Sequence, residues 1–149
     1  DVTVAFRHHP DLRVKRAGGV FVGDDTHNAD AVGQTVQVGR NRGGRAVFYL
    51  RVENDGDGPD RFHLHRLGSD AGLRARYFRG RTAADVTRAG NHGTFTTATL
   101  DPGAAVTIRV EVTVTNTARR NQDHDVVLQA ESAATASRLD TVKATVFVH

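Results

Sequence analysis

The chain has 149 residues, a formal net charge of +3, and no Cys, Met or Trp. This length suits one domain with a single core. The lack of Cys excludes a disulfide framework, a Cys-ligated metal site and a Cys nucleophile. No apolar run approaches the about 20 residues of a membrane-spanning helix. Of the basic residues only Lys15 and Lys143 are lysines, and the arginines are spread along the chain. We therefore expect a solvated arginine-rich surface with no nucleic-acid partner and no membrane span.

The N-terminal segment has the alternation of a strand, with Val2, Val4 and Phe6 on one face. Pro10 cannot donate a ladder hydrogen bond, so pairing is expected to break there. The sequence therefore predicts a terminal strand over residues 1–9 and a sandwich domain over 10–149. The strand could close a preceding repeat, pair with a neighbouring subunit, or be the first strand of this sandwich. A start at Asp1 rather than Met, without Cys, suits an exported, extracellular or cell-surface protein.

A period of two dominates the rest of the chain. The clearest case is 104–115, where Ile108 and four valines share one face and Thr, Arg and Glu share the other. β-branched residues in this pattern favour a strand over a helix. Shorter or weaker versions of the same alternation predict the remaining strands, at 12–15, 35–38, 45–53, 62–65, 73–77, 94–100, 126–131 and 141–148.

Turn-forming clusters separate these strands, for example Gly43-Gly44, Asn54 to Pro59 and Asp101-Pro102-Gly103. No stretch has helical spacing with caps. Many short strands between such turns predict an all-β fold, an antiparallel immunoglobulin-like β-sandwich of roughly seven to ten strands without substantial helix.

Two acidic loops are candidate calcium sites, because carboxylate oxygens are the ligands that calcium prefers. One holds Asp55, Asp57 and Asp60, and the other holds Asp24, Asp25 and Asp30. The first begins like a helix-loop-helix calcium loop, but Pro59 and the missing downstream Glu depart from that pattern. An ordinary acidic turn is the alternative for both, and the sequence demands no cofactor.

The histidines offer a possible transition-metal site, and the catalytic motifs that we looked for are absent from the sequence. His63 and His65 share one strand face, and such a pair can chelate zinc or copper if a third ligand comes from His92 or His124. A solvated strand face is the alternative. The chain lacks a G-x-S-x-G elbow, an H-E-x-x-H motif and a phosphate loop. We therefore expect no enzyme activity.

Glycan binding is a separate possibility, because sandwich modules hold sugars on exposed aromatic rings. Trp is absent, and the outward-facing candidate is Tyr49, with Arg51 two residues on.

Several turn and strand motifs carry a family likeness. Asn54-Asp55-Gly56 ends a long strand, Asp60-Arg61-Phe62 follows, and Leu100-Asp101-Pro102-Gly103 precedes the valine-rich strand. Over residues 45–148 this order resembles bacterial extracellular immunoglobulin-like or fibronectin-III-like modules, most closely NEW3-like and CARDB-like domains. Such modules often carry Trp where this chain has Leu73. The resemblance implies turns and packing, and modules that space, present or polymerise.

Together these observations favour a non-enzymatic extracellular structural module. It would be a fibre- or pilus-like subunit or a tandem repeat, joined to its neighbour by the terminal strand with Val2, Val4 and Phe6. The alternative is a glycan-binding or adhesion accessory module of a secreted or cell-surface protein.

Overall fold

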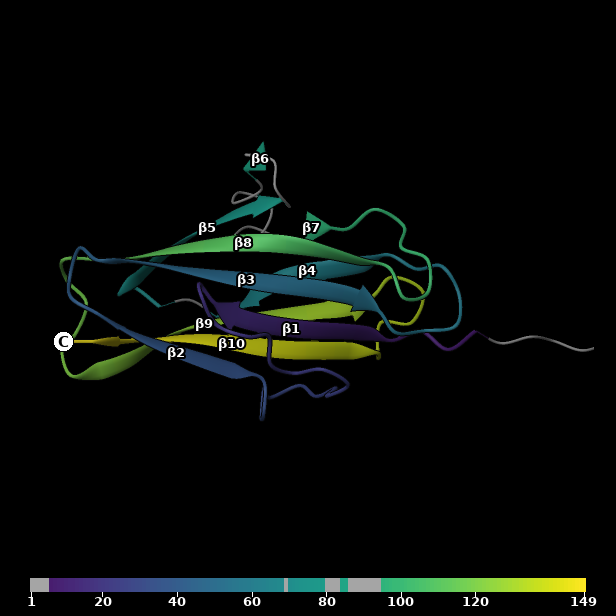
Figure 1. Cartoon of the computed structure of the whole chain (residues 1–149), viewed down its shortest axis with the longest axis horizontal. Helices are drawn as coiled ribbons and strands as arrows, with labels where there is room; N and C mark the ends of the chain where they lie inside the picture. Colours follow the sequence, from purple (N-terminus) through teal and green to yellow (C-terminus); the bar gives the residue numbers. More distant parts are fainter. Residues whose placement is uncertain (1–5, 69, 80–83, 86–94) are drawn as a thin grey trace, which may run out of the picture.

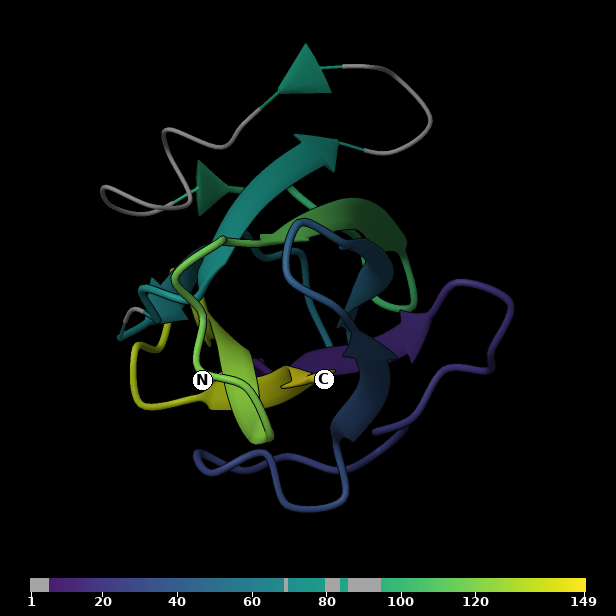
Figure 2. The ribbon, with the colours of Figure 1, turned by 90° about the vertical axis from the view of Figure 1, so that its left-hand side faces the viewer.

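The computed structural model describes residues 6–68, 70–79, 84–85 and 95–149. Its strands form two five-stranded sheets that pack face to face (Figures 1 and 2). One sheet has the order β1-β3-β8-β5-β6 and the other the order β2-β10-β9-β4-β7. The predicted all-β sandwich is confirmed. The strands are β1 (Pro10–Arg16), β2 (Thr35–Arg40), β3 (Arg45–Asn54), β4 (Phe62–Leu67), β5 (Leu73–Arg79), β6 (Ala84–Asp85), β7 (Phe95–Thr96), β8 (Ala105–Val114), β9 (Gln122–Ser132) and β10 (Leu139–Val148).

No helix occurs within these described ranges, so none of the described segments is a helix that could cross a membrane.

The core lies between the sheets and follows the alternation in the sequence. In β3 every second side chain from Ala46 to Val52 is buried, and in β8 every second one from Ile108 to Val114. Phe48 and Phe62, from opposite sheets, are fully buried. Burying one such side chain stabilises the fold by about 1.5–3 kcal/mol. With no disulfide available, strand pairing holds each sheet together, and this apolar layer holds the two sheets against each other.

Strand pairing is antiparallel except at one edge. There β2 pairs in parallel with β10, from Thr35 opposite Lys143 to Arg40 opposite Val148. Within the described residues β2 has a neighbouring strand on one side only. The edge strand β1 is partly covered, because Val14 and Val22 exchange two backbone hydrogen bonds at 2.9 and 3.1 Å.

Two sequence expectations are corrected. Of the strand expected at 94–100, residues 95–100 are described, and of these Phe95–Thr96 form β7. Pairing also does not break at Pro10, since β1 starts there, and the Asp55 and Asp57 N–H groups donate to the His9 and Arg7 carbonyls. The reason is the register. Pro10 lies opposite Asn54. The backbone N–H and carbonyl of Asn54 form their hydrogen bonds on the side of β8 and not toward β1. At this position a β1 residue would therefore point its N–H to the outer edge, so the lack of an N–H in Pro10 costs no ladder bond.

The chain enters the sandwich at one end and leaves it at the other. Residues 6–9 lie at one end of the long axis, and His149 lies at the opposite end (Figure 1). The connection between β1 and β2 runs along the outside of the sandwich beside β2 (Figures 1 and 2).

Candidate functional site

The outer face of the sheet β1-β3-β8-β5 carries a row of alternating cations and aromatic rings. The register places Lys15 opposite Tyr49, Tyr49 opposite Arg109, and Arg109 opposite Phe78. The Lys15 ammonium lies 5.3 Å from the centre of the Tyr49 ring, and the Arg109 guanidinium lies 4.5 Å from that of Phe78. These are cation–π distances. We call Lys15, Tyr49, Arg109 and Phe78 the cation–aromatic row.

More basic side chains flank this row. Arg51, one of the two glycan candidates, lies two residues along β3 and pairs with Arg13 and Thr107. Among the described residues, the buried Nε atoms of Arg51 and Arg109 have no hydrogen-bond acceptor, and Arg109 Nε lies 3.4 Å from Glu111 Oε1. The outer face is therefore mainly basic; Lys15, Tyr49 and Arg109 are partly exposed on it, whereas Phe78 is buried at the end of the row.

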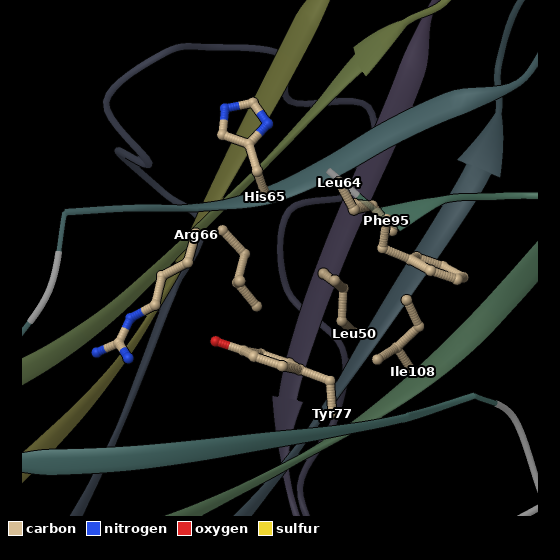
Figure 3. A pocket seen from close by; sticks show the side chains of 8 residues that line it. Leu50, Leu64, His65, Arg66, Tyr77, Phe95 and Ile108 are labelled. Atoms are coloured by element: carbon tan, nitrogen blue, oxygen red, sulfur yellow. The ribbon is translucent and has the colours of Figure 1, made fainter. Parts of the chain in front are cut away.

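A small cavity lies between the sheets. Leu50, Leu64, Phe95, Ile108 and Tyr77 gather around it, whereas the His65 ring points away (Figure 3). Its volume is about 20 Å³, and its lining is almost wholly apolar. That is the space of about one water molecule, so this cavity holds no organic ligand.

The N-terminal residues described by the structure are bound to their own domain. The Asp57 N–H donates to the Arg7 carbonyl at 2.8 Å, and the Arg7 N–H donates to Asp57 Oδ2 at 3.3 Å. Two glycines make room for this segment: a Cβ on Gly56 would lie 2.3 Å from the Arg7 carbonyl oxygen, and one on Gly58 would lie 2.7 Å from the Phe6 ring. Phe6 is still 54% exposed. Val2 and Val4, the other members of the predicted assembly strand, lie outside the described residues.

The first acidic loop does not form a joint ligand set. Asp57 accepts from Arg7, whereas buried Asp60 accepts from the Ser132 hydroxyl and, at 2.8 Å, from the Arg61 N–H. Asp55 Oδ2 instead faces His27 Nε2 at 3.6 Å. These carboxylates hold neighbouring turns in place, and within the described residues they do not meet as a metal site.

The second acidic loop is divided as well. Asp24 and Asp25 come together with Asp11 of β1, with one carboxylate oxygen of each within 4.8 Å of the others. Asp30 is not part of this group, and its Oδ1 accepts from the Val32 N–H at 3.1 Å. Burial raises the pKa of Asp11 to about 6, against the opposing effects of the Asp25 N–H, His27 and Arg13.

The histidine candidates also separate. His63 Nδ1 lies 2.8 Å from the Thr96 hydroxyl. His124 lies in β9 and is buried beside Asp70, and His92 lies outside the described residues. Within those residues the histidines do not assemble a three-ligand zinc or copper site.

Sequence reasoning missed Asp11, Lys15, Arg109 and Phe78. Asp11 looks like the polar start of a strand, and only the return of the 17–34 connection places Asp24 and Asp25 against it. The cation–aromatic row depends on strand order, since its members come from four strands. The sequence did hold one clue to this row: outward positions on three predicted strands carry aromatic or basic residues.

Comparisons with known proteins add a fold likeness. No protein-family profile matches the chain, and no curated protein sequence matches it. A family 123 glycoside hydrolase from Clostridium perfringens is similar in structure, with a TM-score of 0.56 and 8% identity over 94% of this chain and 27% of that one.

Two further structures are more distant. The secreted serine protease VesC from Vibrio cholerae has a TM-score of 0.46 and 13% identity, over 75% of this chain and 21% of that one. The N-terminal domain of PorA has a TM-score of 0.44 and 13% identity, over 92% and 96%. The chain thus spans well under two thirds of the hydrolase and the protease. The likeness to the hydrolase shows a shared β-sandwich fold and nothing about activity.

Proposed function

We propose that this chain is a non-enzymatic structural module of a secreted or cell-surface protein, of the NEW3-like or CARDB-like kind. The observation that carries the proposal is the position of the chain ends. The described chain enters the sandwich through residues 6–9, drawn in purple, and leaves it at the C-terminus, at opposite ends of the long axis (Figure 1). A module with this geometry extends a row of copies or domains by its full length, which suits a spacer or a fibre subunit.

The open edge of β2 supports a contact between copies. In the parallel ladder with β10, the Gln34 and Arg40 carbonyls accept from Lys143 and His149. The alternate residues of β2, Thr35, Gln37 and Gly39, therefore turn their backbone groups to the unpaired side. Such an edge can accept a strand from a neighbour. In this proposal the neighbour's Val2 and Val4 supply that strand, while its Phe6 to His9 stay on their own domain.

The test removes residues 1–5 and measures molar mass by light scattering after size exclusion, with electron microscopy of the same samples. We expect concentration-dependent assembly of the full chain and a monomer after deletion. At low concentration, where both proteins are monomeric, the melting temperature should stay the same, because the contacts of Arg7 and His9 remain.

A matched pair of variants separates the apolar face of the strand from its length. Val2→Ser with Val4→Ser should prevent assembly, whereas Thr3→Ser, on the other face, should leave it intact. A full chain that stays monomeric at high concentration, or a deletion that assembles equally well, would refute the assembly role.

The cation–aromatic row favours a second candidate function, binding of an acidic polysaccharide. Sugar rings stack on Tyr49, and the carboxylate or sulfate groups pair with Lys15 and Arg109. Tyr49→Ala or Arg109→Ala should weaken binding to a polyuronate by about tenfold in titration calorimetry. Thr113→Ala, on the same face of β8, is the control. Equal binding of a neutral glucan, or unchanged affinity of both variants, would speak against this function.

A further inference from the structure

A turn after β1 brings three carboxylates together. The chain leaves β1 at Arg16, folds back so that Val22 pairs with Val14, and then turns through Gly23, Asp24 and Asp25. One oxygen each of Asp11, Asp24 and Asp25 lies within 4.8 Å of the other two. We call these three residues the Asp11 cluster. Asp11 is buried at its base, and Asp24 and Asp25 are exposed at its rim.

Asp11 provides a second and independent observation. Its side chain is 1% exposed, and its Oδ1 has no hydrogen-bond donor. Its Oδ2 has only long contacts, at 3.4 Å from Arg13 Nε and 3.4 Å from the Asp25 N–H. Oδ1 faces the same returning loop, 3.7 Å from His27 Nε2. A buried carboxylate oxygen without a close donor is costly, and a cation beside it would remove that cost.

The charges around the cluster do not balance. Arg13 Nη2 lies 2.6 Å from Asp24 Oδ1 and 2.6 Å from Glu53 Oε2, so the guanidinium is shared between those two acids. Asp55 faces His27 on the other side. Asp11, Asp24 and Glu53 thus share one guanidinium, and these carboxylates outnumber it. The excess negative charge attracts a further cation, and none of the described basic groups donates to Asp11 Oδ1.

The loop is held in the shape that the cluster needs. Asp25 has a φ of 54°, in the left-handed region. Gly23 has a φ of 103°, and a Cβ there would lie 2.7 Å from Gln34 Oε1. Further along, the Asn28 N–H donates to Asp140 Oδ1 at 3.2 Å, and Asn28 Oδ1 accepts from the Ala31 N–H at 2.9 Å. The carboxylates therefore come together on a fixed backbone, which lowers the entropy cost of binding.

We propose that Asp11, Asp24 and Asp25 bind a calcium ion. All three offer hard oxygen ligands, as calcium prefers, and the exposed rim leaves the other coordination positions to water. The site has few protein ligands, and we expect a dissociation constant of about 0.1–1 mM, in the range of extracellular calcium modules. Bound calcium would hold the returning loop against β1. The inference is independent of whether the chain assembles or binds glycans.

The experiment measures the melting temperature of the full chain, stripped with chelator, against calcium chloride. At about 10 mM calcium we expect a rise of about 3–10 °C, and a smaller rise with magnesium at the same concentration. Asp25→Asn should remove most of the calcium-dependent rise, because the residue is exposed and its loss should not unfold the domain. Asp101→Asn, a carboxylate in the turn before β8, should keep the full rise.

Titration calorimetry with calcium chloride on the same proteins gives a second measurement that does not depend on unfolding. Binding that saturates in the wild type, weakens at least about tenfold in Asp25→Asn and persists in Asp101→Asn would support the site. Equal effects of calcium and magnesium in all three proteins would overturn it, as general charge screening. Zinc binding that requires His27, without a calcium effect, would overturn it as well.

Discussion

His124 has a hydrogen-bond acceptor at each ring nitrogen. Nδ1 lies 2.9 Å from Asp70 Oδ1, and Nε2 lies 2.9 Å from the Arg119 carbonyl oxygen. Both contacts are satisfied only when the ring carries two protons. Burial disfavours that charge, but Arg119, Asp70 and nearby Asp125 outweigh it and raise the pKa of His124. Gly72 permits the approach, because a Cβ there would lie 2.5 Å from Nδ1.

This residue gives a pH prediction with a definite sign. A raised pKa means that the contribution of His124 to stability is full below 6.5, its ordinary value, and is lost as the pH rises through the folded-state pKa. His124→Gln should therefore lower the free energy of unfolding by about 1 kcal/mol near pH 5 and by less near pH 9. Urea denaturation of both proteins at several pH values measures the difference.

Asp70, the acid paired with His124, titrates at lower pH and sets the acid end of this pH dependence. Burial works against the charge of Asp70, but hydrogen bonds from His124 and the Gly72 N–H lower its pKa overall. Its contribution is present above 3.8, its ordinary value, and is lost as the pH falls through the folded-state pKa. The effect of His9, whose pKa is lowered by burial and by His27, is common to both proteins and cancels. A loss on His124→Gln that does not change with pH would contradict the ion pair.

At the scale of elements, Asp140 joins three segments that are far apart in the sequence. This fully buried carboxylate of β10 accepts from the Leu12 N–H of β1 at 2.7 Å and from Gln34 Nε2 at 2.6 Å. The Asn28 N–H adds a third bond. Burial raises the pKa of Asp140 despite these donors. One side chain thus connects the edges of both sheets and the connection between them.

Replacing this acid should loosen the edge of the sandwich. In the native protein both carboxylate oxygens of Asp140 accept hydrogen bonds. Asp140→Asn replaces one of these oxygens with an NH2 group, which would face a donor. We expect a loss of about 2 kcal/mol in the free energy of unfolding, measured by urea denaturation. Asp30→Asn is the matched control, since Asp30 is exposed and accepts one backbone bond from Val32. An unchanged denaturation midpoint for Asp140→Asn would contradict this role.

The sequence predicts the individual strands better than it predicts which strands lie side by side. The strands were predictable, because a buried face repeats every second residue, as from Ala46 to Val52 in β3. Their order was not, because the parallel pairing of β2 with β10 joins segments about a hundred residues apart. The cation–aromatic row depends on that order, whereas the Asp11 cluster depends on how the 17–34 connection folds back onto β1. Tyr49, Asp24 and Asp25 could therefore be named from the sequence, but Arg109, Phe78 and Asp11 could not.

At the scale of the whole molecule, the predicted sandwich is confirmed. Of the terminal segment predicted over residues 1–9, the part from 6 to 9 lies against its own domain. Local pattern alone placed Phe6 with Val2 and Val4, since all three share an alternating face. The structure binds residues 6–9 to the turn that follows β3, through Gly56 and Gly58. That contact could not be read from the sequence, because a glycine in a turn indicates backbone freedom and not which segment lies against it.

The contacts of Arg7 and His9 on that turn have a mechanical consequence. They extend the β1–β3 ladder to the point where the chain enters, and β10 is paired on both sides up to its final residues at the other end. Tension between the two ends therefore acts along the strands and across their hydrogen bonds, which lie perpendicular to the strands in the antiparallel pairs and slanted in the β2–β10 pair. Under load the terminal strands would have to slide past their neighbours, straining many bonds together, and could not be peeled away one bond at a time.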